Sequence, residues 1–247
     1  VVGRTATLTI KPGTTILFQR LDANNDGIGD SEIRVQGQII AEGTAELPIT
    51  FTSAEKNPAA KDWSYLLLFT SGKKNSLRYC NFQHAFSGLQ VHFSTAVIQD
   101  CTFRNNLEGI RFGRAKITID HNSITNNTIG IRFTRMEGPA EIRNNLISQN
   151  DVGIFLVPSG QNIMDFFEPG RTGKAWNEGH LEIYSNNVYN NRHYNLKLGA
   201  KQMWNLKASN NWWGSAKHED IIAKIFDKHR DSELGQVKLT PILSEPE

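Results

Sequence analysis

A short repeat in the middle of the chain constrains the fold more than any other sequence feature. Four glycines recur with separations of 21, 21 and 23 residues, and the residues one and three positions after each glycine are apolar. These glycines are Gly88, Gly109, Gly130 and Gly153. A second series with the same separations consists of Cys80, Cys101, Asn122 and Asn145. A fixed short period of this kind is the signature of a solenoid, in which each repeat is one coil stacked on the next.

The repeat has the pattern of strands rather than of a strand and a helix. The residues one and three positions after each glycine are apolar and the residue between them is mostly polar, as in a strand with one buried face. About 21 residues can hold three short strands and their turns, so we predict an all-β solenoid with in-register parallel strands about 4.8 Å apart. Amide residues suit the predicted corners, because Asn tolerates left-handed backbone and its amide can bond to equivalent amides on neighbouring coils. These corner pairs are Asn105-Asn106, Asn126-Asn127 and Gln149-Asn150.

Composition removes several classes of protein. The 247 residues carry a formal net charge of +2, so no overall field favours nucleic acid or a membrane surface. No apolar run reaches the length of a membrane-spanning helix, so we expect no membrane span. Two cysteines are too few for a disulfide framework. Because in-register neighbours point their side chains in parallel, we expect Cys80 and Cys101 to be a buried thiol pair rather than a disulfide.

The densest acidic cluster lies at residues 22–32, before the regular coils. It begins with Asp-x-Asn-x-Asp-Gly, an order in which alternate residues aim oxygens at one centre and glycine permits the sharp turn of a calcium loop. The pattern departs from an EF-hand, because its twelfth position is Ile33 and no helices flank it. A solvated turn is the alternative, but the convergence of five oxygen side chains favours a structural Ca²⁺ ion. The expected ligands are Asp22, Asn24, Asp26, the carbonyl of Ile28, Asp30 and Glu32.

The period breaks after Val157. Residues 158–179 do not fit a coil, and we expect them to form a long loop excursion. Both series resume 42 residues later, two nominal coils on, at Asn187 and Asn195. A helix predicted over residues 219–229 would cover the open end of the solenoid. We therefore divide the chain into a parallel β-helix (1–214) and a C-terminal capping helix and strand (215–247).

Several segments resemble right-handed parallel β-helix proteins with the pectate-lyase-like fold. The four glycine repeats look like the short coil motif of that family. Residues 8–15 and 41–53 are similar to the opening coils of bacterial cell-surface β-helix proteins, and residues 210–214 to their closing segment. The resemblance implies a single-stranded right-handed parallel β-helix that is extracellular, on the cell surface or periplasmic. It does not select an activity, because this fold hosts lyases, hydrolases, epimerases, adhesins and scaffolds.

Outward positions of the regular coils contain the best candidate for ligand binding. Arg111 and Arg132 occupy equivalent positions, and Arg114 and Arg135 each follow three residues later. Four guanidinium groups at coil spacing would form a positive stripe suited to a carboxylated or sulfated polymer. Trp176, in the excursion, is the aromatic residue best placed to stack on a sugar. The alternative, which we favour because surface charges usually serve solubility, is a solvated face. Its acidic partners would be Glu108, Glu137 or Glu141.

Catalytic patterns of this fold are not evident in the sequence. Asp100 and Asp120, in adjacent coils, have different offsets from the second series and are therefore expected on opposite faces. The acidic cluster lies several coils away from the arginine stripe. We therefore expect a secreted or cell-surface β-helix without catalytic activity, which binds a polysaccharide or another cell-surface protein or acts as a scaffold. The alternative is a lyase, hydrolase or epimerase acting on an acidic polysaccharide.

Overall fold

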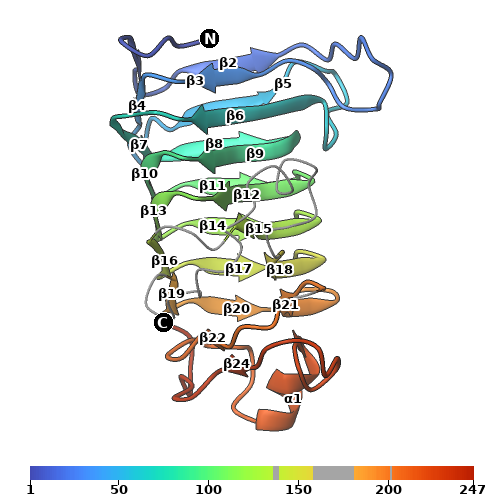
Figure 1. Cartoon of the computed structure of the whole chain (residues 1–247). Helices are drawn as coiled ribbons and strands as arrows, with labels where there is room; N and C mark the ends of the chain where they lie inside the picture. The colour runs from blue at the N-terminus through green and yellow to red at the C-terminus, as the bar shows by residue number, and fades with distance from the viewer. Residues whose placement is uncertain (136–138, 158–180, 201) are drawn as a thin grey trace, which may run out of the picture.

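The chain winds into a right-handed parallel β-helix with its coils stacked from one end to the other (Figure 1). The computed structural model describes residues 1–135, 139–157, 181–200 and 202–247. Each full coil contributes one strand to each of three parallel sheets, which we call A, B and C. The three sheets form the sides of a prism, as the sequence repeat predicts.

The strands of each sheet follow one another at intervals of three in the chain. Sheet B contains β1 (Thr7–Ile10), β4 (Gln38–Glu42), β7 (Lys74–Arg78), β10 (Thr95–Gln99), β13 (Lys116–Asp120), β16 (Ala140–Arg143) and β19 (Leu181–Tyr184). Sheet C contains β2 (Thr15–Phe18), β5 (Ile49–Ser53), β8 (Cys80–Gln83), β11 (Thr102–Arg104), β14 (Ser123–Thr125), β17 (Leu146–Ser148) and β20 (Asn187–Tyr189). Sheet A contains β3 (Ile33–Val35), β6 (Trp63–Phe69), β9 (Ala85–His92), β12 (Glu108–Gly113), β15 (Ile129–Arg135), β18 (Val152–Leu156), β21 (Tyr194–Leu198) and β23 (Ile225–Phe226).

Aligned rows of apolar side chains fill the interior. The residue after each glycine of the repeat is fully buried, and its partners in the sheet are the equivalent residues of the coils on either side. On sheet C, the rings of Phe51, Phe82 and Phe103 stack with centroids 4.7 and 4.8 Å apart. Such ring pairs contribute about 0.5–1.5 kcal/mol each beyond their burial. The inward ladder predicted from the sequence is confirmed.

Two ladders of buried amides hold the corners between the sheets. At the corner from sheet C to sheet A, each side-chain amide donates to the next, at 3.0 Å in every step. This ladder consists of Asn106, Asn127, Asn150 and Asn191. The ladder at the corner from sheet B to sheet C consists of Asn122, Asn145, Asn186 and Asn211. The residue before each buried amide has positive φ, as at Asn105 and Asn126, so the predicted corner chemistry is confirmed.

The repeated glycines are required by the closeness of the coils. A Cβ atom added at Gly109 would lie 2.6 Å from the carbonyl oxygen of Gly130 and 3.2 Å from a side-chain carbon of Ile124. The same 2.6 Å approach separates a Cβ at Gly130 from the carbonyl oxygen of Gly153. No side chain fits at these distances without moving the backbone of the next coil.

Two details of the coil assignment differ from the prediction. β16 pairs directly with β19 and β18 with β21, so the break after Val157 spans one coil with an insertion rather than two coils. The amide ladder resumes at Asn186, not Asn187, since Asn145 bonds to the Asn186 amide oxygen. The predicted excursion at residues 158–179 lies outside the described residues.

The C-terminal cap is shorter and more extended than the sequence predicts. The helix α1 covers His218–Ala223 rather than residues 219–229. It ends early because Ile225 and Phe226 become β23, which pairs with Leu196 and Lys197 and adds a final strand to sheet A. Two further short strands, β22 (Leu206–Lys207) and β24 (Val237–Lys238), pair with each other beneath the last coil.

Candidate functional site

The arginine pair predicted from the sequence forms a compact charged group on the outside of sheet A. We call Glu108, Arg111 and Arg132 the arginine face. Arg111 of β12 and Arg132 of β15 are direct partners in the sheet. Arg132 Nη1 lies 2.5 Å from Glu108 Oε1, and Arg111 Nη1 lies 3.8 Å from Glu108 Oε2. One carboxylate therefore lies between two guanidinium groups from adjacent coils.

The glycine of the repeat explains why Glu108 faces outward. A Cβ at Gly109 would meet Ile124 and Asn127, so this position faces the interior. In a strand, the residue before an inward position faces the opposite way. Glu108 therefore projects on the same side of sheet A as Arg111. The sequence offered Glu108 as one of three acidic partners, and the structure selects it for this pair. Of the other two, Glu141 lies on sheet B and residue 137 is outside the described part.

Burial makes this group more than a solvated ion pair. The Glu108 side chain is 1 % exposed, whereas those of Arg111 and Arg132 are 24 % and 28 % exposed. Burial lowers the pKa of Arg111, and Arg132 acts in the same direction while Glu108 opposes it. Within the described residues, the Nε atoms of both arginines are buried without a hydrogen-bond partner. The group holds two cations for one anion, and its exposed atoms belong to the cations.

Aromatic and cationic residues continue the outward row of sheet A beyond the arginines. Strand register places Phe155 next to Arg132, then Lys197, then Phe226. The Lys197 ammonium lies 5.5 Å from the centre of the Phe155 ring and 5.3 Å from that of Phe226, within cation–π range. Sequence reasoning did not single out Lys197, although the signal was present: it follows Asn195, which replaces the repeat glycine, by two residues, as Arg111 follows Gly109.

A second polar group lies on sheet A toward the N-terminus. Arg34 Nη2 lies 2.9 Å from Glu32 Oε1. The pKa of Tyr65 is raised, first by burial and then by its hydrogen bond to Glu32. Ser87 pairs with Tyr65 on one side and with Glu108 on the other, so the two groups lie in one row of sheet A. No sequence pattern marked Tyr65, because its strand precedes the regular repeats.

Of the other predicted ligand-binding residues, Arg114 lies in the described part of the structure. A register shift after Phe112 places Gly113, rather than Arg114, opposite Arg135, so the two arginines are not equivalent as predicted. The Arg114 guanidinium lies 5.5 Å from the centre of the Phe93 ring. Trp176 and the Arg135 side chain lie outside the described part of the structure.

The predicted calcium loop is organised by its own backbone. Asp22 accepts hydrogen bonds from the N–H groups of Asp26 and Gly27, at 3.1 and 3.0 Å. Asp26 accepts from Ile28 at 2.8 Å, and Asp30 accepts from Ala23 at 2.7 Å. These bonds hold Asp22, Asp26 and Asp30 in one loop. The Asn24 amide also belongs to it, because it bonds to Asp26.

Glu32 differs from the other predicted calcium ligands. Its carboxylate pairs with Arg34 on sheet A instead of turning back into the loop. In the described residues, no group of three or more His, Cys, Asp or Glu side chains has the placement of a metal site. Calcium binding by Asp22, Asn24, Asp26 and Asp30, completed by backbone carbonyls and water, stays a prediction.

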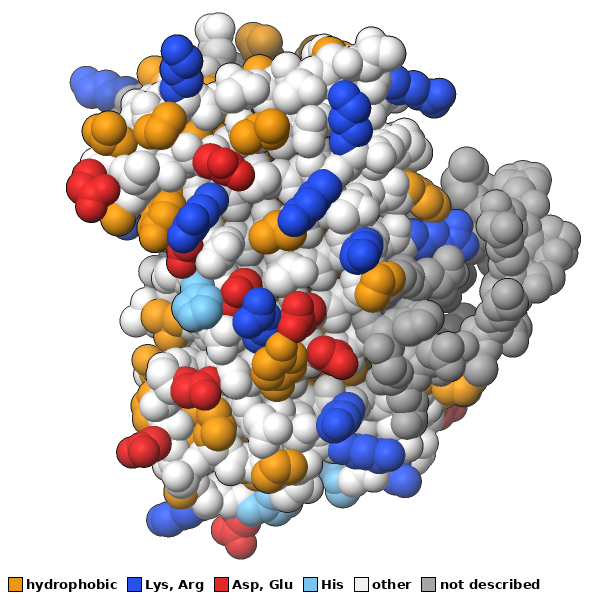
Figure 2. All heavy atoms as spheres, turned by 90° about the vertical axis from the view of Figure 1, so that its left-hand side faces the viewer, with side chains coloured by type: hydrophobic (Ala, Val, Ile, Leu, Met, Phe, Trp, Pro, Cys, Tyr) orange, Lys and Arg blue, Asp and Glu red, His pale blue; other side chains and the backbone are white. Residues whose placement is uncertain are grey.

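A mixed cluster lies on the outer face of sheet B (Figure 2). Asp120 pairs with His121 Nδ1 at 2.7 Å and with Arg143 at 3.0 Å. Arg143 also contacts Glu141 at 3.2 Å, and Glu141 accepts a short hydrogen bond from Tyr184. Acidic, basic and histidine side chains alternate on this face, so it has the character of a solvated surface. Asp100, the other carboxylate considered from the sequence, pairs separately with Arg78 at 3.1 Å.

The architecture defines a class: a right-handed β-helix with a polar and aromatic outer row on sheet A. The "Right handed beta helix region" family matches residues 66–217, more than half of the chain, and the "Pectate-lyase like beta helix domain" family matches residues 1–90. The chain belongs to the right-handed β-helix family. No curated protein matches it. No helix in the described part of the chain is long and apolar enough to cross a membrane.

A solved structure with some similarity is an alginate lyase from Paenibacillus sp. str. FPU-7. The two sequences are 13% identical, and the alignment covers 96% of this chain and 98% of that one. The TM-score is 0.26, which carries no argument about the fold or the activity of this protein.

Proposed function

We propose that this protein is an extracellular binding module that holds a negatively charged linear polysaccharide against sheet A. Carboxylate or sulfate groups of the polymer would contact Arg111 and Arg132. The observation that carries the proposal is the ratio of charges on the arginine face. Two partly exposed guanidinium groups share one buried carboxylate, so the face keeps a net positive charge and donors directed outward.

The rest of the outward row supports a polymer rather than a small anion. Phe155 and Lys197 follow Arg132 on successive coils, so cationic and flat apolar groups recur along the helix axis. Aromatic faces stack on the apolar sides of sugar rings, while Arg and Lys side chains neutralise acidic substituents. A chain lying along this row would meet such groups at coil spacing, about 4.8 Å per step.

The geometry favours binding without catalysis. Glu108 is the carboxylate nearest to the two arginines, and both ion pairs with it are already formed. Its carboxylate is buried beneath the two guanidinium groups, which lie between it and a polymer bound on the outside of the sheet. Calcium held by the loop at Asp22 to Asp30 would then stabilise the first coils rather than act on the polymer.

The test is a titration with polygalacturonate, alginate and heparin, each followed by isothermal calorimetry at low and high salt. We expect at least one acidic polymer to bind, and its affinity to fall as salt rises, because screening weakens the contacts. In the variant Glu108→Gln/Arg111→Gln/Arg132→Gln, which leaves no buried charge unpaired, affinity should fall by about tenfold or more. Arg4→Gln, which makes the same change in net charge elsewhere, should bind normally. Equal loss in both variants would contradict the proposal.

A second candidate function, β-elimination of an acidic polysaccharide, is favoured by one observation. The partly exposed guanidinium groups of Arg111 and Arg132 would neutralise a uronate carboxylate and so make the neighbouring ring proton more acidic. Prolonged incubation with each polymer would distinguish the two candidates. Accumulation of unsaturated products, lost in Arg111→Gln, would establish a lyase and remove the claim that the module only binds.

A further inference from the structure

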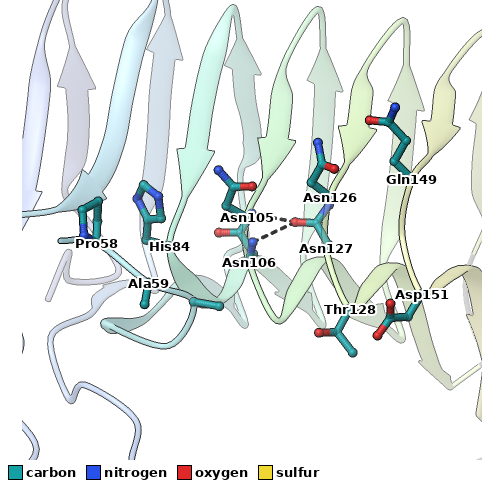
Figure 3. Close-up of a pocket in the computed structure, with 11 residues that line it drawn as sticks. Pro58, Ala59, His84, Asn105, Asn106, Asn126, Asn127, Thr128, Gln149 and Asp151 are labelled. Atoms are coloured by element: carbon teal, nitrogen blue, oxygen red, sulfur yellow. Dashed lines mark hydrogen bonds between the residues drawn. The ribbon is translucent and has the colours of Figure 1, made fainter. Parts of the chain in front are cut away.

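A groove with different chemistry runs along the corner between sheets C and A. It is an open groove with a volume of about 410 Å³. Pro58 and Ala59, from the loop between β5 and β6, lie at one end beside His84 (Figure 3). From there the lining continues over successive coils through Asn105 and Asn126 to Gln149. The groove is separate from the arginine face, none of whose residues lines it.

The amides that line this groove differ from the buried ladder beneath them. Asn106 and Asn127 have both ends of their amides bonded, to each other and to backbone. The preceding residues, Asn105, Asn126 and Gln149, are exposed, and within the described part of the chain their amides have no hydrogen-bond partner. One member of each pair therefore holds the fold, and the other presents a free donor and acceptor to the groove.

Backbone conformation does not account for these exposed amides. They occupy positions with positive φ, which Asn tolerates well. The equivalent positions at the corner between sheets B and C also have positive φ, and they are occupied by Tyr79, Asp100, His121 and Ser185 as well as by Asn144 and Asn210. Gln149, moreover, lacks the left-handed preference of Asn, but keeps the amide group. What distinguishes this corner is an unbroken series, because Asn105, Asn126 and Gln149 lie on consecutive coils, whereas Ser185 separates the two amides at the other corner. The turn alone does not require such a series.

The groove is preorganised at its apolar end. The buried carboxylate of Asp62 accepts hydrogen bonds from the Ala59 N–H at 2.9 Å and from the Ser53 hydroxyl at 2.7 Å, which fixes the loop that carries Pro58. The His84 ring is oriented by a 2.9 Å hydrogen bond between Nδ1 and the Thr52 hydroxyl. A ligand would therefore order little of the protein when it binds.

The groove also carries little net charge. Its one acidic residue, Asp151, pairs with Arg192 at 3.0 Å. The pKa of His84 is lowered, mainly by burial, so the ring is neutral near pH 7. Free amides, a neutral imidazole and a short apolar wall match a ligand that is polar but uncharged.

We propose that this groove binds an uncharged linear polysaccharide, with sugar hydroxyls bonded to Asn105, Asn126 and Gln149 and a ring face against Pro58. The amides recur at the coil spacing of about 4.8 Å, which is close to the sugar repeat of an extended β-linked pyranose chain. An extended peptide repeats its outward groups every ~6.6 Å and would lose register within two coils. The site is independent of the acidic polymer proposed for sheet A.

The experiment uses the full chain and neutral β-1,4-linked hexasaccharides of glucose, mannose and xylose as probes, with binding followed by calorimetry. We expect one of them to bind. The double variant Asn126→Gly/Gln149→Gly removes two amides while keeping residues that tolerate positive φ, and should weaken binding about tenfold or more. Asn210→Gly removes an exposed amide from a positive-φ position at the other corner and should have no effect.

Several outcomes would overturn the inference. They are the absence of binding by all three hexasaccharides at millimolar concentration, full binding by the double variant, and equal loss in Asn210→Gly. Competition by polygalacturonate would show that the two polymers share one site and would also reject it. Normal hexasaccharide binding by Glu108→Gln/Arg111→Gln/Arg132→Gln is expected. The experiments can therefore reject the proposal for the groove while supporting the proposal for the arginine face, and the reverse.

Discussion

In the ladder between sheets B and C, two cysteines occupy the positions before the first asparagine. This replacement leads to a prediction about stability. Cys101 occupies the ladder position before Asn122, whose amide oxygen accepts the Cys101 N–H at 2.9 Å. The Cys101 thiol faces the carbonyl oxygens of Leu77 and Gln99 at 3.5 and 3.2 Å. Asn122 donates to the equivalent carbonyls at 3.0 Å each. An asparagine at position 101 would therefore find the same partners already in place.

The substitution Cys101→Asn should stabilise the protein. Thiols are weak donors and acceptors, whereas a net amide hydrogen bond contributes about 0.5–1.5 kcal/mol. The new amide would donate to the Leu77 and Gln99 carbonyls and accept the Cys80 N–H, which now reaches the Cys101 sulfur at 3.4 Å. Allowing for the loss of the existing weak bonds and the ordering of a larger side chain, we expect a gain of about 1–2 kcal/mol in the free energy of unfolding.

The reverse substitution is the internal check. Asn122→Cys should cost about 1–3 kcal/mol, because the amide makes two bonds to backbone carbonyls and a third to Asn145 at 3.0 Å. Guanidinium unfolding followed by circular dichroism measures both changes, and Cys101→Ala reports the value of the existing thiol contacts. If Cys101→Asn is as unstable as Cys101→Ala, the new amide does not form hydrogen bonds to the Leu77 and Gln99 carbonyls, and the prediction is wrong.

Three further perturbations test other parts of the structure. Gly130→Ala should destabilise the protein by about 1–3 kcal/mol, since a Cβ would lie 2.6 Å from a carbonyl of the next coil; Gly72→Ala, where a Cβ meets nothing within 4 Å, should be neutral in the same thermal melt. The hydrogen bond to Glu141 raises the pKa of Tyr184 from 10.0 to about 12. The unfolded chain loses this proton first, so stability should decline between those pH values; Tyr184→Phe should remove that part of the decline in alkaline unfolding curves, and an unchanged curve would contradict the pairing. Ca²⁺ at a hundredfold excess over its Kd should stabilise the chain by about 2.7 kcal/mol, and Asp26→Asn should abolish most of that shift; persistence of the shift would place the ion elsewhere.

The regular coils could be predicted because the same residues recur where the same contacts recur. Gly109 and Gly130 mark the close approach of backbones, and the apolar residues after them mark the interior. Prediction failed where local pattern and tertiary pairing disagreed. Ile225 and Phe226 continue an amphipathic helical pattern, but the exposed edge of β21 recruits them as a strand. An unpaired sheet edge leaves backbone groups without partners, and this outweighs a weak helix propensity.

The candidate site was predictable in part for the same reason. Arg111 and Arg132 share a register, so their proximity followed from spacing alone. The equivalence of Arg114 and Arg135 did not hold, because a bulge after Phe112 shifts the register by one residue. The choice of Glu108 as partner depends on the inward orientation of a glycine, which a simple alternation of strand residues does not reveal.

In a solenoid, repetition alone does not distinguish structure from function, and the asparagine pairs show how the two can be separated. Asn106 and Asn127 repeat because each amide satisfies the backbone of the coil before it, so every bond it can form is used inside the protein. Asn105 and Asn126 repeat as regularly, but their backbone conformation is shared at the other corner by residues without an amide. A residue that recurs without a contact to explain it is the place to look for a ligand that recurs with the same spacing.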